Sequence, residues 1–130
     1  MNKQTPILVL VTLQYASARL IRKGVDVAMK KGCPLHVLHV TSMPDKVQGE
    51  PAINAKVLDY LYALSGEAGA EMCVIAAEVP VTAIANYAQK HGVRQLIMGG
   101  GENSHGMAQT LSQLMPGVRV EIVMQEDAIA

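Results

Sequence analysis

The sequence predicts an α/β protein with a doubly wound, mainly parallel sheet of five strands and helices on both faces. Continuous aliphatic runs of strand length, such as ILVLV at residues 7–11, are typical of strands that are covered on both faces. Between these runs lie segments whose apolar residues recur at helical spacing, so strands and helices alternate along the chain. Alternation of this kind requires crossover connections between parallel strands.

The first half of the chain is predicted from these two periods and from its glycines and prolines. Gly32 is placed where a helix C-cap needs a residue that tolerates a left-handed conformation. The apolar face of the first helix is predicted to consist of Leu20, Ile21, Val25, Ala28 and Met29. The elements expected here are a strand at 7–11, a helix from Ser17 or the adjacent Ala16 to Gly32, a strand at 34–40, a loop at 41–51 and a helix at about 53–65.

The second half continues the alternation. Pro80 suits the first turn of a helix, and Pro116 with Gly117 ends another. The expected elements are a strand around 72–76 within the segment 71–79, a helix from Pro80 to about His91, a strand at 95–98, a short helix at about 104–114 and a strand at 118–124, followed by a frayed end at 126–130. In the last strand Val118, Val120, Ile122 and Met124 alternate with polar residues, which predicts a less buried strand at a sheet edge.

Composition limits the class of protein. The chain of 130 residues is expected to form a single domain over 1–130. Lys plus Arg equal Asp plus Glu at 11 each, which argues against nucleic acid or an anionic membrane as the main partner. We expect no signal peptide and no membrane span, because the apolar runs are too short. Cys33 and Cys73 lack metal-ligand spacing, so we expect reduced thiols in a cytoplasmic protein.

A glycine run after the fourth strand is the main candidate for a binding site. Leu96, Ile97 and Met98 lead directly into Gly99, Gly100 and Gly101, and a predicted helix begins a few residues later. Such glycines can adopt positive φ and let a ligand approach the backbone, while a helix N-terminus offers unpaired N–H groups to an anion. The alternative is that the glycines only allow a sharp turn at the sheet edge.

The position of this run within a doubly wound sheet extends the candidate site. Ligands of such sheets bind beyond the carboxyl ends of the strands, where the strand order reverses. If the first and fourth strands flank that point, residues 12–15 and 99–104 face one crevice. The candidate ligand-binding residues are Thr12, Gln14, Gly99, Gly100, Gly101, Asn103 and Ser104.

Several segments resemble the universal stress protein family over nearly the whole chain. They are ILVLV, SARLIRKGVDVAMKKGCPLHVLHV, EVPVTAIANYAQKHGVRQLIMGGG and VRVEIV. The SARLIR segment is also similar to the stress-protein-like domain of potassium-sensing histidine kinases. The resemblance implies a sheet in the order 3-2-1-4-5 and a homodimer formed through the last strand, residues 118–124.

Many members of this family bind ATP, and this chain departs from their pattern. The family has an aspartate after the first strand, where this chain has Thr12 and Gln14. Gly99 matches the first glycine of the family's phosphate signature, but Glu102 stands where the second is expected. A carboxylate close to a bound phosphate costs about 1 kcal/mol or more at a partly screened separation. The spacing puts Ser112 at the third glycine and leaves open whether Thr110 or Ser112 supplies the hydroxyl group that follows it.

The kinase-linked branch of the family can bind cyclic di-AMP through paired serines after the first strand and an aromatic-rich second strand. The matching stretches here are TLQYAS and LHVLH, so the motif is absent and Thr12, Gln14 and His39 are the polar replacements. His36 and His39 are expected to point to opposite faces of the sheet.

We therefore predict a small cytoplasmic regulatory or signalling domain, a non-enzymatic homodimer with a degenerate nucleotide pocket and a possible regulatory protein partner. The alternative is a stress protein that binds ATP or a related adenine nucleotide, with slow hydrolysis. No cofactor is assigned. An unrelated enzyme is disfavoured because no Ser-His-Asp order emerges, and Ser104 next to His105 is expected to be an ordinary loop pair. The basic residues of the first helix are predicted to form a solvated face, with Arg19 as a lesser candidate for phosphate.

Overall fold

The computed structural model describes residues 5–42, 55–101 and 104–124. Most of the loop predicted at 41–51 and all of the end predicted at 126–130 lie outside the described residues. The elements are, in chain order, β1 (Ile7–Leu10), the 3-10 turn η1 (Tyr15–Ser17), α1 (Ala18–Lys31), β2 (Leu35–Ser42), α2 (Ala55–Glu67), β3 (Glu71–Ala77), α3 (Pro80–His91), β4 (Gln95–Gly99), α4 (Ser104–Leu114) and β5 (Arg119–Val123).

The five strands form one parallel sheet in the order β3-β2-β1-β4-β5. This confirms the predicted fold class and strand order. In the register of the sheet, Ile7 of β1 pairs with Leu35 of β2 on one side and with Gln95 of β4 on the other. The strand order reverses between β1 and β4, so their carboxyl ends flank the switch point of the sheet. β5 lies at one edge, as its alternating pattern predicted.

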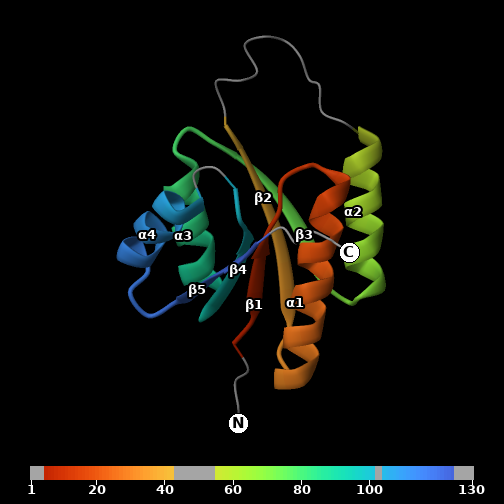
Figure 1. The fold of residues 1–130 in the computed structure, drawn as a ribbon, viewed down its shortest axis with the longest axis horizontal. Helices are drawn as coiled ribbons and strands as arrows, with labels where there is room; N and C mark the ends of the chain where they lie inside the picture. Colours follow the sequence, from red (N-terminus) through yellow and green to blue (C-terminus); the bar gives the residue numbers. More distant parts are fainter. Residues whose placement is uncertain (1–4, 43–54, 102–103, 125–130) are drawn as a thin grey trace.

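Helices cover both faces of the sheet (Figure 1), with α1 and α2 on one face and α3 and α4 on the other. Each face has its own core. Val9, Ile21 and Leu61 are among the fully buried residues of the first core, and Leu8, Leu96 and Leu111 are among those of the second. Burial of the two cores is the main force that holds the helices on the sheet.

The approach of α1 to the sheet requires a glycine at one position. A Cβ atom on Gly24 would collide with the Cγ2 atom of Val9 and lie 3.1 Å from Cδ1 of Leu35. The close packing fixes α1 over β1 and β2, and thereby fixes the first turn of α1 at the carboxyl end of β1.

The helix ends follow the sequence signals. α1 and α3 end at Gly32 and Gly92, which adopt left-handed conformations with φ of 67° and 70°. These glycines allow the final carbonyl groups of each helix to be satisfied without the strain that a Cβ atom would cause. Pro80 occupies the first turn of α3, as predicted.

Two predictions about the first half were wrong in detail. Thr41 and Ser42 belong to β2 rather than to a loop, because they pair with Ala76 and Ala77 of β3. Met29 is 76% exposed and does not belong to the apolar face of α1. That face instead continues through Gly24 and Ala28, both of which are buried.

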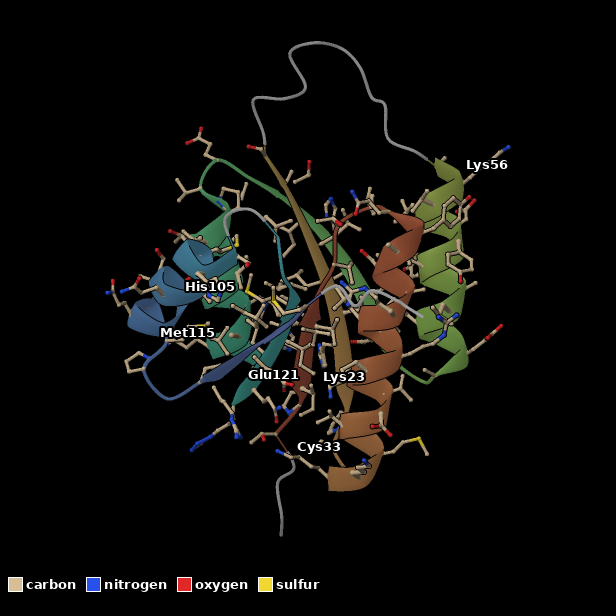
Figure 2. The ribbon with its side chains drawn as sticks, viewed as in Figure 1. Lys23, Cys33, Lys56, His105, Met115 and Glu121 are labelled. Atoms are coloured by element: carbon tan, nitrogen blue, oxygen red, sulfur yellow. The ribbon has the colours of Figure 1, made fainter. Side chains whose placement is uncertain are left out.

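A polar network joins α1 to the edge strand. The amide of buried Gln95 accepts a hydrogen bond from Lys31 Nζ at 2.9 Å and donates one to Glu121 Oε1 at 3.3 Å. Lys23 lies 3.9 Å from the other oxygen of Glu121, and Figure 2 shows these two side chains approaching each other from α1 and β5. The side-chain oxygen and nitrogen of Gln95 both have hydrogen-bond partners, so its burial leaves neither atom unsatisfied.

No helix within the described ranges combines the length and the apolar character that crossing a membrane requires.

Candidate functional site

A cavity of about 410 Å³ lies at the carboxyl ends of β1 and β4. α1, α3 and α4 all begin beside it, so three helix N-termini give it a positive potential. The residues lining it include six of the seven predicted ligand-binding residues, Thr12, Gln14, Gly99, Gly100, Gly101 and Ser104. The seventh, Asn103, and the predicted obstacle Glu102 lie outside the described residues.

The turn between β1 and α1 is held by a buried serine. Ser17 Oγ donates a hydrogen bond to the Thr12 carbonyl oxygen at 2.8 Å and accepts one from the Thr12 amide at 3.3 Å. The Thr12 hydroxyl lies 3.3 Å from both Ser17 Oγ and the side-chain oxygen of Gln14. These contacts fix the backbone of the turn, while the exposed side chains of Thr12 and Gln14 remain at the cavity surface.

Arg19 brings a positive charge to the cavity wall. It extends from the first turn of α1 across the end of β4, where its Nη2 would lie 3.8 Å from a Cβ atom on Gly99. Its Nη1 donates a long hydrogen bond of 3.5 Å to the carbonyl oxygen of Met124. Its Nε is buried and has no hydrogen-bond partner among the described residues. A buried donor without a partner is costly, so a ligand acceptor at this position would be favoured.

The glycine run takes a conformation that was not predicted. None of Gly99, Gly100 and Gly101 has a positive φ, so the expectation that these glycines are needed for left-handed backbone is wrong. Gly99 and Gly100 are needed for space instead, whereas a Cβ atom on Gly101 would meet no heavy atom within 4 Å. A Cβ atom on Gly99 would lie 3.2 Å from Cδ1 of Leu20, and one on Gly100 would lie 2.6 Å from the sulfur atom of Met124.

One backbone N–H group of the glycine run already has a hydrogen-bond partner. The Gly100 N–H donates to the carbonyl oxygen of Val123 at 2.9 Å and so continues the pairing of β4 with β5. The Gly101 N–H has no hydrogen bond to any described residue. An anion at this loop would therefore meet Gly101 and the start of α4 rather than Gly100.

The first residue of α4 supplies the hydroxyl group nearest to the glycine run. Ser104 is buried, and its Oγ donates to the Gly101 carbonyl oxygen at 3.0 Å. Thr110 donates to the carbonyl oxygen of Gly106, and Ser112 is exposed on α4. Neither of these lines the cavity. The short connection between β4 and α4 explains this outcome, because it brings the helix start itself to the loop.

His39 also lines the cavity. Its Nδ1 lies 2.9 Å from the carbonyl oxygen of Val11, and because a carbonyl oxygen only accepts, Nδ1 carries the proton. In the neutral ring, Nε2 is then an acceptor. The side chains of His39, Thr12 and Gln14 thus give the cavity polar groups that can bind hydroxyl or amino groups of a ligand.

The remaining wall is largely apolar. It includes Leu10, Val40, Ile84, Met98 and Met107. Within the described part of the chain, Arg19 is the only Lys or Arg that lines the cavity, and no Asp or Glu does so. The cavity therefore suits a ligand with one apolar, ring-like portion and one anionic group.

A second cluster lies at the opposite, amino end of the strands. His36 Nδ1 is 2.6 Å from the Tyr87 hydroxyl, and the His91 ring lies 4.2 Å from that of Tyr87 between ring centroids. Burial, and then the nearby His91, lower the pKa of His36, against a smaller opposing effect of Glu71. Burial, with the neighbouring Cys73 and Glu71, raises the pKa of Tyr87 to about 12.

The histidines of β2 thus point to opposite faces, as predicted, and only His39 reaches the cavity. Cys33 and Cys73 are free, and Figure 2 shows Cys33 at the end of the molecule where α1 finishes, far from the first turn of that helix. The described residues contain no group of His, Cys, Asp and Glu side chains that could hold a metal ion. His105 is exposed on α4, and the Ser104 hydroxyl is directed to Gly101.

Compared by sequence, the chain matches no protein-family model and no curated protein. Compared by structure, it is similar to universal stress proteins. One of these, a universal stress protein in complex with cAMP, superposes with a TM-score of 0.69 at 13% identity over 96% of this chain and 100% of that chain. Another, from Archaeoglobus fulgidus in complex with dAMP, gives 0.60 at 14% identity over 97% and 100%. A third, from Burkholderia pseudomallei, gives 0.65 at 17% identity over 92% and 95%.

The chain therefore has the fold of universal stress proteins, and the resemblance read from the sequence is confirmed. Arg19 was predicted only as a lesser candidate for phosphate binding, because a helical pattern rich in Lys and Arg predicts a solvated face. Its position in the first turn after β1, beside the expected switch point, was the available signal. No feature of the sequence indicated the contact of Met124 with Gly100.

Proposed function

We propose that this protein is a non-enzymatic regulatory domain of the cytoplasm that binds an adenine nucleotide in the cavity at the carboxyl ends of β1 and β4. The observation that carries the proposal is Arg19, whose buried Nε has no partner among the described residues and which lines a cavity next to the glycine run. The apolar wall suits a purine ring, and the guanidinium suits a phosphate group. The complexes of similar structures with cAMP and dAMP support the same class of ligand.

The non-enzymatic part of the proposal rests on the groups that the cavity lacks. Hydrolysis of a phosphate ester or anhydride needs a group that activates water, and in most such sites carboxylates hold a metal ion. No carboxylate of the described residues lines this cavity, and the Ser104 hydroxyl is hydrogen-bonded to a backbone carbonyl. Release of phosphate from ATP by the purified protein would contradict this part of the proposal.

Calorimetric titration with AMP, cAMP and ATP tests the binding. We expect at least one of these to bind the wild-type protein, and Arg19→Gln to weaken that binding by about tenfold to a hundredfold, since a hydrogen bond to a charged group contributes about 1.5–3 kcal/mol. Arg22→Gln is the matched control, because Arg22 lies on the same helix but is exposed and outside the cavity. Absence of binding by all three nucleotides, or equal losses in the two variants, would refute the proposed site.

The proposal includes a homodimer formed through β5. Among the described strands, β5 pairs with β4 alone and lies at the edge of the sheet, and an edge strand is a natural surface for pairing with a second copy. Light scattering at high micromolar concentration is expected to show a dimer. A monomer under these conditions would contradict pairing through β5 and would leave the binding proposal standing.

A further inference from the structure

The hydroxyl group of Ser17 does not cap the helix that it precedes. Ser17 lies at the N-cap of α1, where a serine usually accepts a hydrogen bond from one of the first N–H groups of the helix, but here its side chain makes no such bond. Its Oγ instead turns back to the end of β1, where it donates to the Thr12 carbonyl oxygen at 2.8 Å and accepts from the Thr12 amide at 3.3 Å. Ser17 is only 3% exposed and lines the cavity. Helix capping therefore does not account for this buried hydroxyl group.

The two sides of the turn between β1 and α1 are anchored differently. On the helix side, residues 18, 20 and 21 are buried in the first core and hold the start of α1. On the strand side, Thr12 and Gln14 are exposed at the cavity surface. Ser17 bonds both backbone groups of Thr12, and it therefore ties the exposed end of β1 to the anchored helix.

The same contacts decide whether the Thr12 hydroxyl group donates or accepts toward a ligand. The single hydrogen atom of Ser17 Oγ is donated to the Thr12 carbonyl oxygen, so Thr12 is the donor in the 3.3 Å contact between the two hydroxyl groups. The other acceptor within reach of this hydroxyl group, Gln14 Oε1, is also 3.3 Å away. The hydrogen atom of the Thr12 hydroxyl group is thus directed into the turn, and the lone pairs of its Oγ1 remain for a donor group of a ligand.

We propose that Ser17 is a positioning residue of the nucleotide site that acts through Thr12. It fixes the end of β1 and makes the Thr12 hydroxyl group an acceptor for a hydroxyl or amino group of the nucleotide. The inference rests on the proposed function, because it concerns a nucleotide bound in the same cavity. Ser17 itself has no hydrogen atom left for a ligand, since it donates that atom to the Thr12 carbonyl oxygen.

A double-mutant cycle of Ser17→Ala and Thr12→Val tests the inference by calorimetric titration with whichever of AMP, cAMP and ATP binds the wild-type protein most tightly. Thr12→Val keeps the backbone groups that Ser17 contacts and removes the hydroxyl group, so we expect it to weaken binding about threefold to tenfold. Ser17→Ala should weaken binding to a similar extent in the wild-type protein, but by less than about twofold in the Thr12→Val background. A merely structural effect of Ser17 would be equal in the two backgrounds.

Ser65→Ala is the matched control. Ser65 is also buried, but its Oγ donates to the Leu61 carbonyl oxygen within α2, and it does not line the cavity. This variant should bind the nucleotide as the wild-type protein does. Ser17→Thr keeps the hydroxyl group, so it serves as a second variant and should bind within about twofold of the wild-type affinity.

The outcomes separate this inference from the proposed function. If Thr12→Val or Ser17→Ala binds as tightly as the wild-type protein, the inference is wrong and nucleotide binding stands. The same holds if the loss in Ser17→Ala is unchanged in the Thr12→Val background, or if Ser17→Thr loses as much affinity as Ser17→Ala. If none of the three nucleotides binds the wild-type protein, the proposed function fails and the inference fails with it. A loss in Ser17→Ala that disappears in the Thr12→Val background, and that is absent in Ser17→Thr and Ser65→Ala, is the expected result.

Discussion

Replacing Gly99, Gly100 and Gly101 by alanine, one at a time, tests what this loop requires of its residues. Alanine at Gly100 meets the thioether of Met124, which can swing away, and the Cα of Met124, at 3.3 Å, which cannot move without the end of β5. That movement would strain the hydrogen bond between the Gly100 N–H and Val123. We expect Gly100→Ala to lower the free energy of unfolding by about 1–2 kcal/mol, from overpacking and a weakened hydrogen bond.

The neighbouring positions give different expectations. Gly99→Ala places a Cβ atom 3.2 Å from Leu20 Cδ1, which a small shift of a flexible side chain relieves, so a loss of about 0.5 kcal/mol is expected. A Cβ atom on Gly101 has no heavy atom within 4 Å, and the residue has no positive φ. Gly101→Ala is therefore expected to be neutral or to stabilise the protein by about 0.4–1 kcal/mol through the unfolded chain.

Urea denaturation followed by circular dichroism measures all three. The expected order of stability is Gly101→Ala, then Gly99→Ala, then Gly100→Ala, with unchanged dependence on urea concentration. If Gly101→Ala is the most destabilised of the three, the loop needs glycine for its backbone conformation, and our account of the loop is wrong.

Three further predictions concern stability. Ser17→Ala should lower the free energy of unfolding by about 1–3 kcal/mol, because the buried hydroxyl bonds both backbone groups of Thr12. Gly24→Ala should cost about 1–3 kcal/mol, because the new methyl group collides with Val9 in a packed core. For His36, the unfolded state has the higher pKa, near 6.5, and binds more protons, so stability should fall as the pH drops below about 7. His36→Gln should make that fall shallower.

Controls for these variants lie on α4 and have open surroundings. Ser112 is exposed, and Ser112→Ala is expected to change stability by less than about 0.5 kcal/mol. A Cβ atom on Gly106 would meet no heavy atom within 4 Å, so Gly106→Ala should cause no loss. If a control changes as much as the variant it accompanies, the local explanation for that variant is incorrect.

The fold was predictable because its signals are strong and local. Buried runs such as residues 7–11 and helix ends such as Gly32 and Gly92 specify elements directly, and the alternation of elements specifies the sheet class. Details that depend on pairing between distant segments could not be predicted from the local sequence pattern. Thr41 and Ser42 join β2 only because β3 extends beside them, which a local pattern rich in polar residues does not reveal.

The sequence predicted the location of the candidate site, but only part of what its residues do there. The glycine run and Thr12 lie at the cavity because parallel strands present their carboxyl ends at one edge. The role of the glycines was misjudged, because room beside Met124 depends on the path of β5 and not on local sequence. Ser104, which was predicted as a candidate residue, lines the cavity, whereas Ser112, to which the family spacing pointed, does not.

The most direct test of the central claim is a titration of the ¹⁵N-labelled protein with AMP, followed through the Nε–H resonance of Arg19 and the backbone amides of Gly99 and Gly101. Because the buried Nε has no partner among the described residues, a bound phosphate should shift its resonance strongly and saturably, together with the two amides. The amide of Gly100, which is bonded to Val123, should shift less. Shifts confined to residues outside the cavity, or an unchanged Arg19 resonance at saturating AMP, would contradict the account.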